Sequence, residues 1–335
     1  MEYLDIDQLL IDKGRYFWID VRSPKEYDHA HIPNAISLPI FSDEERHIIG
    51  TLYKQESREK AISKGLDFFG FKMSKFVETV KNNNVEKLPL AVYCWRGGMR
   101  SRAMAWLLDF YGFEVKVVQG GYKAFRNWAL SRFEDKYTFK ILGGYTGSGK
   151  TEILNSQQEL GFPVIDLEGL ARHKGSTFGG LGLAPQPSQE MFENMLSLAL
   201  FQFKSYYIWL EDESSRIGAL SIPKGIREQM IQAPLYFIQI SFEDRLQRIM
   251  EDYGGFELND LIASVLRIQR KLGGLLTNQI VEHLNNKQIK DAFSLLLGHY
   301  DNLYKKGIHY GKPLERPVFM VDLGQELDIF QNKNQ

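Results

Sequence analysis

The run Gly-Tyr-Thr-Gly-Ser-Gly-Lys-Thr at residues 144–151 constrains the fold of this 335-residue chain more than any other feature. It fits the phosphate-loop pattern G-x-x-x-x-G-K-[ST] at every fixed position. Residues 137–142 before it are rich in β-forming side chains, and residues 151–160 after it resemble a helix in composition. A strand, a tight loop and a helix in this order predict a parallel α/β sheet, with the loop N–H groups around phosphate oxygens. Lys150 would add a mobile positive charge, and the Thr151 hydroxyl could hold Mg²⁺.

An acidic run, Glu211-Asp212-Glu213, directly follows the apolar segment 206–210. Carboxylates at the carboxyl end of a parallel strand lie at the sheet edge where phosphate and metal bind. Asp212 and Glu213 are therefore candidate metal ligands, or partners of such ligands. The sequence does not decide which of the three acidic residues would face a metal, and it assigns no metal with certainty. The competing interpretation is that the run is solvated or caps a helix.

Cys94 is the only cysteine of the chain and opens the segment Cys-Trp-Arg-Gly-Gly-Met-Arg-Ser at residues 94–101. An apolar run at 88–93 predicts a buried strand before it, and an Ala-, Leu- and Met-rich run at 101–111 predicts a helix after it. Loop N–H groups at a helix start, together with arginines, stabilise a thiolate and bind an oxyanion. The alternative is a lone cysteine buried as a small apolar side chain. The candidate anion-binding residues of this loop are Arg96, Gly97, Gly98 and Arg100.

Two upstream motifs give the Cys94 loop a family resemblance. Residues 20–27, Asp-Val-Arg-Ser-Pro-Lys-Glu-Tyr, and residues 31–35, His-Ile-Pro-Asn-Ala, resemble the entry half of a rhodanese domain. Cys94 then falls where that family carries its persulfide-forming cysteine. Six positions separate Cys94 from Arg100, one more than in the common sulfurtransferase loop, so a larger anion is expected. This C-x5-R spacing also resembles that of phosphatases, which makes dephosphorylation a competing function. Asp20, Arg22, Glu26 and His31 are expected to have structural roles as capping and paired charges.

The chain is expected to form two α/β domains, because apolar runs alternate with helical segments over a length typical of two domains. Residues 1–130 would form a rhodanese-like parallel sheet with flanking helices, in the order strand, strand, helix, strand, helix and a last strand at 115–118. Residues 131–335 would form a P-loop NTPase-like parallel α/β domain. Strands of this second domain are expected at residues 137–142, 164–165, 206–210 and 235–240.

The net charge of −1 gives no overall basic field for a polyanionic partner. Local patches are still compatible with RNA binding. Arg267, Arg270 and Lys271 recur at helical spacing and are candidate nucleic-acid contacts, with a solvated helix face as the alternative. Residues 242–253 also resemble the arginine-bearing lid helices of P-loop kinases, in which arginines would close over phosphates.

No membrane or export signal is evident in the sequence. No apolar stretch approaches the ~18 residues needed to span a bilayer. The first residues lack the basic and apolar regions of a signal peptide, and a single cysteine agrees with a reducing compartment. We therefore expect a cytoplasmic protein without membrane association.

A glycine-rich loop between the phosphate loop and the acidic run completes the pattern. It reads His-Lys-Gly-Ser-Thr-Phe-Gly-Gly at 173–180, followed by Pro-Gln-Pro-Ser-Gln at 185–189 and Glu-Asp-Glu-Ser-Ser-Arg-Ile-Gly at 211–218. Such a loop is a candidate substrate-binding lid, with an ordinary surface loop as the alternative. Together with the rhodanese-like and P-loop segments, these motifs closely resemble the bacterial tRNA 2-selenouridine synthases from about residue 5 to about residue 320.

The resemblance implies a transferase that acts on tRNA with a wobble 2-thiouridine. Members of that family replace the sulfur with selenium from selenophosphate, and they also attach a geranyl group to the sulfur from geranyl diphosphate. Cys94 matches the essential cysteine, which would either take selenium as a selenosulfide or hold the donor. No tightly bound cofactor is expected, and Mg²⁺ is the one candidate ion.

The same resemblance assigns the remaining candidate residues. Arg96, Gly97, Gly98 and Arg100 would bind selenophosphate, and Arg267, Arg270 and Lys271 would contact the tRNA. The residues that match the Walker-A segment, and that would bind a diphosphate, are Gly144, Gly147, Ser148, Gly149, Lys150 and Thr151.

Two functions of other classes stay open at this point. A P-loop kinase or NTPase with a regulatory rhodanese module would turn over nucleotide without RNA. A nonenzymatic tRNA- or partner-binding protein is the third possibility, and the acidified Cys94 pocket argues against it. In a geranyl transferase the phosphate loop would stabilise departing diphosphate. Tyr145 and Phe178 are then candidates for contact with the prenyl chain, with ordinary packing as the alternative.

Overall fold

The computed structural model describes residues 2–204, 206–309, 316–322 and 329–330 and contains two compact units. Unit 1 comprises Met1–Arg132 with Glu193–Ser197, and unit 2 comprises Phe133–Phe192 with Leu198–Gln335. The boundary expected from the sequence, between residues 130 and 131, lies two residues before the first division. Among the described residues, no helix combines the length and apolar character that crossing a bilayer requires.

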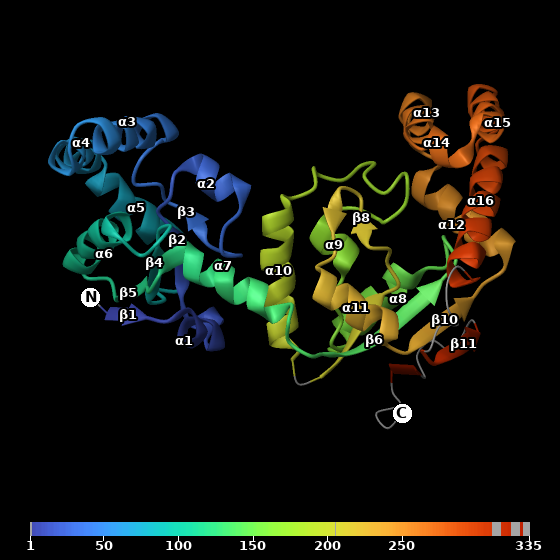
Figure 1. Cartoon of the computed structure of the whole chain (residues 1–335), viewed down its shortest axis with the longest axis horizontal. Helices are drawn as coiled ribbons and strands as arrows, with labels where there is room; N and C mark the ends of the chain where they lie inside the picture. Colours follow the sequence, from blue (N-terminus) through green and yellow to red (C-terminus); the bar gives the residue numbers. More distant parts are fainter. Residues whose placement is uncertain (1, 205, 310–315, 323–328, 331–335) are drawn as a thin grey trace. The chain divides into compact units, whose positions relative to one another are not determined.

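Unit 1 is a five-stranded, fully parallel sheet in the order β1-β5-β4-β2-β3, with helices on both faces (Figure 1). The predicted rhodanese-like α/β architecture is thereby confirmed. Its strands are β1 (Glu2–Leu4), β2 (Phe17–Asp20), β3 (Ile36–Ser37), β4 (Leu90–Tyr93) and β5 (Val115–Val118). Its helices are α1 (Ile6–Ile11), α2 (Pro24–His29), α3 (Asp43–Gln55), α4 (Arg58–Gly70), α5 (Met73–Asn83), α6 (Met99–Tyr111) and α7 (Gly121–Arg132), with a 3-10 turn at Lys13–Arg15.

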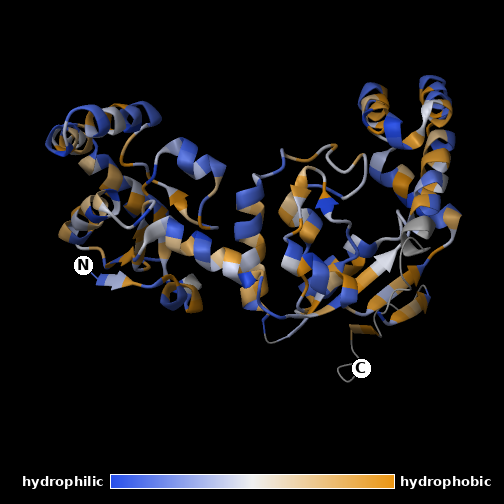
Figure 2. Cartoon of the chain, viewed as in Figure 1, coloured by the Kyte–Doolittle hydropathy of each residue, from blue (hydrophilic) through white to orange (hydrophobic). Residues whose placement is uncertain are grey.

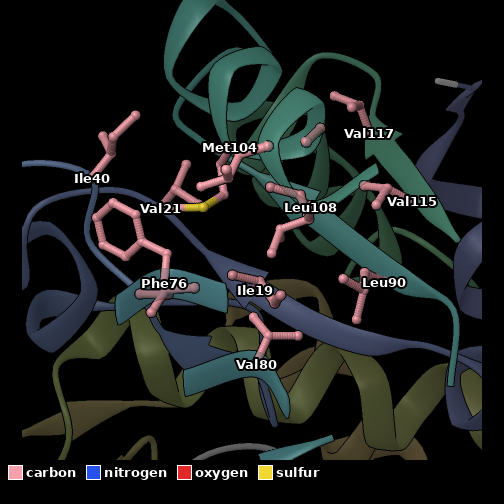
Figure 3. Packing of buried hydrophobic residues seen from close by; sticks show 14 of the residues in the cluster. Ile19, Val21, Ile40, Phe76, Val80, Leu90, Met104, Leu108, Val115 and Val117 are labelled. Atoms are coloured by element: carbon pink, nitrogen blue, oxygen red, sulfur yellow. The ribbon is translucent and has the colours of Figure 1, made fainter. Parts of the chain in front are cut away.

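Alternation along the strands divides the core of unit 1 between the two faces of the sheet. Ile19 and Leu90 point toward the helices α5 and α6, where they meet Val80 and Leu108 (Figure 3). Trp18, the neighbour of Ile19, is also buried but lies outside that cluster, because successive side chains of a strand point to opposite faces. Both faces are therefore apolar, as a parallel sheet covered on two sides requires.

The order of elements predicted for unit 1 was wrong in its helices and lacked one of the five strands that the described residues form. The structure places α1 between the first two strands, α2 between β2 and β3, and three helices rather than one between β3 and β4. The first two helices are six residues long, too short for an apolar periodicity to identify them. The start of α3 carries a signal that periodicity ignores, since the Ser42 side chain accepts the Glu45 N–H in a capping box.

Unit 2 is built on a four-stranded, fully parallel sheet in the order β11-β10-β6-β7, which confirms the predicted P-loop-like architecture. Its strands are β6 (Thr138–Gly144), β7 (Tyr207–Glu211), β10 (Leu235–Gln239) and β11 (Val318–Asp322), with an antiparallel pair β8 (Arg216–Ile217) and β9 (Leu220–Ser221). Its helices are α8 (Lys150–Glu159), α9 (Leu167–Ala171), α11 (Lys224–Gln232), α12 (Phe242–Tyr253), α13 (Leu258–Arg267), α14 (Gln269–Leu272), α15 (Gly274–Asn285) and α16 (Ile289–His309). Helix α10 (Gln189–Gln202) has its residues Glu193–Ser197 in unit 1.

Helices α12 to α16 bury a second apolar cluster beside the sheet. Figure 2 shows hydrophilic and hydrophobic residues alternating along these helices, as expected for elements with one buried face. The cluster contains Leu246 and Tyr253 of α12 together with Phe293 and Leu297 of α16. This packing supports one wall of the site described below.

The strand expected at residues 164–165 is reduced to a single parallel bridge between Val164 and Trp209. The chain cannot continue as a strand because α9 begins three residues later. Asp166 caps that helix, with its carboxylate accepting the Gly169 N–H at 2.8 Å.

A buried ion pair between Asp20 and Arg22 stabilises the end of β2, in agreement with the structural role predicted for both residues. Both side chains are at most 1% exposed, and Arg22 Nη2 donates to Asp20 Oδ2 at 2.6 Å. Arg22 Nη2 also donates to the Ala30 carbonyl at 2.6 Å, and its guanidinium lies 3.9 Å from the centroid of the Tyr122 ring. The pair therefore joins β2, the loop after α2 and helix α7 within unit 1.

Removing the charge of Asp20 alone should destabilise the protein strongly. The variant Asp20→Asn leaves a guanidinium buried without its counter-charge, which typically costs about 3–5 kcal/mol. The double variant Asp20→Leu/Arg22→Met removes both charges and should lose clearly less. Urea unfolding of the full chain measures both, and a double variant less stable than Asp20→Asn would contradict this account.

Candidate functional site

The Cys94 thiol lies at the carboxyl end of β4, in the five-residue loop before α6. Its Sγ is 3.2 Å from the Gly98 nitrogen, which donates to it, and 3.3 Å from the Ser101 hydroxyl oxygen. The side chain is 4% exposed. The strand, loop and helix predicted around Cys94 are confirmed, and the helix starts at Met99, two residues earlier than expected.

Close contact with the start of α7 fixes the shape of the Cys94 loop. The Tyr122 N–H donates to the Cys94 carbonyl at 2.8 Å, and the Lys123 N–H donates to the Trp95 carbonyl at 3.0 Å. Gly121 has φ +62°, and a Cβ on it would lie 2.2 Å from the Cys94 carbonyl oxygen. Only glycine permits this approach, so the turn after β5 is part of the site.

The electrostatic surroundings of Cys94 favour the thiolate. Burial alone would raise the pKa of the Cys94 thiol. The hydrogen bond with Ser101, the charge of Arg100 and the N–H groups of Ser101 and Arg96 outweigh it, so that the pKa lies below its ordinary value. The sulfur is thus prepared to act as a nucleophile.

The arginines of the loop have different environments. Arg100 forms an ion pair with Glu26 at 2.7 Å, and both side chains are partly buried. Burial would raise the pKa of Glu26, but the hydrogen bond and charge of Arg100 hold it below its usual value. The side chain of Arg96 is exposed and forms no ion pair within the described part of the chain. Binding of selenophosphate by Arg96, Gly97, Gly98 and Arg100 stays a prediction.

The predicted phosphate loop connects β6 to α8 in unit 2. Three of its glycines have positive φ: Gly144, Gly147 and Gly149. A Cβ on Gly147 would lie 2.8 Å from the Arg245 carbonyl, and one on Gly149 would lie 1.7 Å from Arg248 Nη1. The Ser148 hydroxyl is buried and has no hydrogen-bond partner in the described structure. A cradle of this shape with an unsatisfied polar atom suits an anion.

Lys150 and Thr151 connect this loop to carboxylates. Lys150 Nζ lies 3.2 Å from the Gly144 carbonyl and 3.4 Å from Glu211 Oε1. The Thr151 hydroxyl lies within hydrogen-bonding distance of two carboxylates, 3.0 Å from Glu211 Oε2 and 3.2 Å from Glu168 Oε2. The strand end and the helix start thus meet at one edge of the sheet, as in other phosphate-binding α/β proteins.

Three carboxylates gather beside Thr151: those of the buried Glu168 and Glu211 and that of the partly buried Glu213. One oxygen from each lies within 4.8 Å of the others. Burial and the charge of Glu211 raise the pKa of Glu168 to about 9, and the same two causes raise the pKa of Glu213 to about 7. Burial also raises the pKa of Glu211, against the effect of Lys150. An oxygen-rich site with this excess of negative charge fits a hard divalent cation such as Mg²⁺.

The structure separates the two acidic residues that the sequence paired as metal candidates. Glu213 belongs to the cluster, but the Asp212 carboxylate accepts the Tyr304 hydroxyl at 2.8 Å and lies 3.6 Å from Arg316 Nη2. The reason is that successive side chains at the end of a strand point to opposite sides. Glu211, which was left out of the predicted pair, takes the place beside Thr151.

A cavity of about 940 Å³ extends from the phosphate loop, and its walls differ in character. Lys150 and the carboxylate cluster occupy one end, and Arg227 and Arg316 also line it. Phe178 is buried and contributes to the apolar wall, whereas Tyr145 packs edge-on against Phe237 instead. The apolar and aromatic lining residues are Phe178, Ile231, Ile249, Tyr253, Phe293, Leu296, Leu297, Tyr300, Leu303 and Tyr304.

The glycine-rich loop at 173–180 forms part of this wall. Lys174 Nζ pairs with Asp252 at 3.0 Å, and Ser176 and Thr177 contact the hydroxyls of Tyr253 and Tyr300. Gly175 has φ +61°, and a Cβ on it would lie 2.5 Å from Glu168 Oε1. The loop is tied to α12 and α16 in this structure, and its function as a lid stays a prediction.

The two arginines of α12 do not act alike. Arg245 is buried, donates to the Thr146 carbonyl at 3.1 Å and pairs with Asp301 at 2.7 Å, so it supports the phosphate loop from behind. The position of Arg245 differs from the expectation that the arginines of residues 242–253 would close over bound phosphate. Arg248 lies beside Gly149 and 3.7 Å from Glu152, where its guanidinium can approach a bound anion.

The candidate RNA contacts lie at the junction of α13 and α14. Arg267 ends α13, and Arg270 and Lys271 lie in α14. All three are exposed, and the described residues provide none of them with an ion pair. Their role in binding tRNA stays a prediction.

Several residues that complete both sites were not predicted from the sequence. Glu168 follows the apolar pair 164–165 by three residues, so an acidic residue after a second strand-like run was the available signal. Gly121 lies just after the strand predicted at 115–118, but nothing local indicated its contact with Cys94. Arg227 and the apolar wall from α16 carry no motif, because amphipathic helices expose the same pattern whichever surface they cover.

Comparison with known proteins agrees with both units. Residues 5–127 match the rhodanese-like domain family, and residues 137–309 match the family described as the tRNA 2-selenouridine synthase AAA domain. A tRNA 2-selenouridine synthase of Shewanella denitrificans is 34% identical over 85% of this chain and 86% of that protein. One from a Sulfurovum species is 36% identical over 93% of each chain. The N-terminal domain of a Clostridium difficile protein described as ATP/GTP-binding is 34% identical over 38% of this chain and 99% of that domain, with a TM-score of 0.37.

Alkylation of the single thiol should report the acidified state of Cys94. The pH midpoint for reaction with iodoacetamide should lie below that of an ordinary cysteine, whose pKa is about 8.5. In Ser101→Ala the midpoint should rise, because the thiolate loses a hydrogen-bond partner. In Ser131→Ala, which removes a hydroxyl bonded to the Trp128 carbonyl in α7, it should not move. Equal midpoints in native protein and Ser101→Ala would contradict this assignment.

The carboxylate cluster should make the protein less stable as pH rises. Glu213 keeps its proton up to about pH 7 and Glu168 up to about pH 9 in the folded state. An unfolded glutamate loses its proton near pH 4.3, so the free energy of unfolding falls between these values. Glu213→Gln should flatten this fall and raise the melting temperature at pH 8 by several degrees.

Thermal unfolding between pH 5 and 9 tests this expectation. Glu251→Gln, at an exposed position of α12, serves as the matched control and should leave the pH profile unchanged. A profile that Glu213→Gln does not alter would show that the cluster is already ionised in the folded protein.

Proposed function

Because this chain belongs to the tRNA 2-selenouridine synthase family, we propose that it converts wobble 2-thiouridine of tRNA to 2-selenouridine through S-geranylation. Geranyl diphosphate would alkylate the thiocarbonyl sulfur, and selenium from selenophosphate would then replace the geranylated sulfur. Selenouridine modification of tRNA is the activity named for the relatives, whereas the geranyl step and the two small substrates are our proposal. A tRNA substrate also favours action in the cytoplasm.

The cavity in unit 2 is the observation that carries the geranyl step. A phosphate loop lies at one end and an apolar wall lies within the same 940 Å³ space. Small-molecule sites usually occupy about 300–1,000 Å³. A prenyl diphosphate has the same division, a doubly charged head and an apolar tail, so each part meets a complementary surface. Phe178, Phe293 and Leu297 would contact the chain.

The residues at the polar end suit a departing diphosphate. As the bond between geranyl C1 and oxygen breaks and the bond to sulfur forms, negative charge grows on the diphosphate. The loop N–H groups and Lys150 would stabilise that charge. Thr151, Glu211 and Glu213 would hold Mg²⁺, which would neutralise part of the diphosphate charge when bound. Arg227 is partly buried, and its pKa is lowered by that burial, which favours an anionic partner.

The Cys94 loop would bind the second small substrate. Geranylation turns the ring sulfur into a leaving group, so a selenium nucleophile can displace it at the ring carbon as geranylthiol. Arg96, Arg100 and the loop N–H groups would bind the phosphate part of selenophosphate. Arg267, Arg270 and Lys271 would contact tRNA phosphates, whose binding would weaken as salt increases.

The two halves of the reaction should be separable by mutation. Lys150→Ala should eliminate geranyl transfer to thiolated tRNA, and Cys94→Ser should abolish selenium incorporation while geranylated tRNA still forms. Nucleoside mass spectrometry of RNA digested after incubation with both small substrates measures the two products. Native protein should hydrolyse ATP slowly or not at all.

Two results would count against the proposal. ATP turnover without RNA at typical enzyme rates, about 1 per second or faster, would favour a P-loop NTPase instead. Geranylation that continues in Lys150→Ala would show that the phosphate loop holds another ligand.

A further inference from the structure

Electron balance restricts what Cys94 can do to selenophosphate. Selenium in that donor is already fully reduced, as selenide bonded to phosphorus(V). Forming a bond between the Cys94 sulfur and this selenium would leave phosphorus as phosphite unless an oxidant were added. Neither the chain nor the proposed reaction supplies an oxidant. Attack of the thiolate at phosphorus needs none.

The Cys94 loop has the geometry for an attack at phosphorus. The N–H of Gly98 points at Sγ from 3.2 Å, and the Ser101 hydroxyl oxygen lies 3.3 Å from the sulfur. An oxyanion placed against the sulfur would meet the same donors, at the start of the 13-residue helix α6. Five residues separate Cys94 from Arg100, the C-x5-R spacing that resembles the phosphoryl-binding loop of phosphatases.

Arg100 can bind the phosphoryl oxygens without losing its ion pair. The Glu26 carboxylate accepts hydrogen bonds from Arg100 Nη1 at 2.7 Å and from Arg100 Nη2 at 3.4 Å. A guanidinium has five N–H donors, so three remain for an anion. Because Glu26 is held ionised, it has no proton to give a leaving group. Selenide leaves as HSe⁻, a weak base that requires no proton donor.

Building on the proposed function, we propose that Cys94 is a phosphoryl acceptor. The thiolate attacks phosphorus, a sulfur–phosphorus bond forms, and the phosphorus–selenium bond breaks. The donor reacts with its selenium protonated, as HSe–PO₃²⁻, so selenium leaves with the bonding electron pair as HSe⁻. Water then attacks phosphorus, and the products are inorganic phosphate and the free thiolate. No atom changes oxidation state, and the released HSe⁻ displaces geranylthiol from the modified uridine.

Ser101 has a positioning role in the second step. Its hydroxyl oxygen lies 3.3 Å from Sγ and 3.1 Å from the Gly98 carbonyl oxygen, so its proton can turn from that carbonyl to the thiolate as the sulfur–phosphorus bond breaks. A hydrogen bond to a charged group contributes about 1.5–3 kcal/mol. Ser101→Ala should therefore slow hydrolysis of the phosphocysteine about tenfold or more, which makes the intermediate accumulate.

The test uses the full chain and selenophosphate under anaerobic conditions, without tRNA or geranyl diphosphate. Rapid quenching and peptide mass spectrometry should find a phosphoryl group on Cys94, in small amount in native protein and in larger amount in Ser101→Ala. Selenide and phosphate should be released together. Ser131→Ala should behave as native protein, and Arg100→Lys should form the adduct more slowly because it lacks the planar fork.

Three outcomes would overturn the proposal. These are selenium rather than phosphorus on Cys94, phosphate release by Cys94→Ser at the native rate, and no adduct in native protein or Ser101→Ala while tRNA is selenated. Failure of the proposed function looks different, since it would appear as missing selenouridine although the phosphoryl adduct forms. If Ser101→Ala does not fold, the early burst of adduct in quenched native protein decides the question.

Discussion

Parallel strand pairing is the constraint on which both candidate sites depend. When all strands of a sheet run in one direction, the loops that follow them emerge at the same edge. In unit 1 this places the loop after β4, with Cys94, against the turn after β5, with Gly121. In unit 2 it places the loop after β6 beside Glu211 at the end of β7. Residues far apart in sequence thus meet without any special local structure.

The two sites differ in the sign of the charge that their surroundings favour. Around Cys94, hydrogen-bond donors and Arg100 outweigh the effect of burial and stabilise one anion. In unit 2, two buried carboxylates and the partly buried Glu213 lie near a single lysine, and burial together with their mutual repulsion raises the pKa values of Glu168 and Glu213. The carboxylates of such a cluster either keep their protons and stay neutral, or lose them and bind a cation. The diphosphate and Mg²⁺ that we propose as ligands would bring both charges into the same cavity.

The sequence predicted those parts of the sites whose chemistry lies within one short segment. Cys94, Lys150 and Thr151 stand in contiguous motifs, and their strand–loop–helix contexts follow from local composition. Glu168 and Gly121 matter through contacts across the sheet edge, which no local pattern encodes. The choice of Glu211 over Asp212 depends on which way alternate side chains face, so an error of one residue reverses the assignment. The apolar wall of the cavity could not be predicted either, because its residues come from separate helices and no local pattern shows that they meet.

The redox state of Cys94 also favours phosphoryl chemistry over a selenosulfide. A selenosulfide on Cys94 would have to be reduced in each catalytic cycle, and a resolving thiol usually does this. Cys94 is the only cysteine in the sequence, so a resolving thiol would have to come from outside the chain. A phosphocysteine needs only water to return to the thiolate. The acidified sulfur, the converging N–H groups and the forked arginine all serve that reaction, because each lowers the energy of an anion at phosphorus or of the thiolate that leaves it.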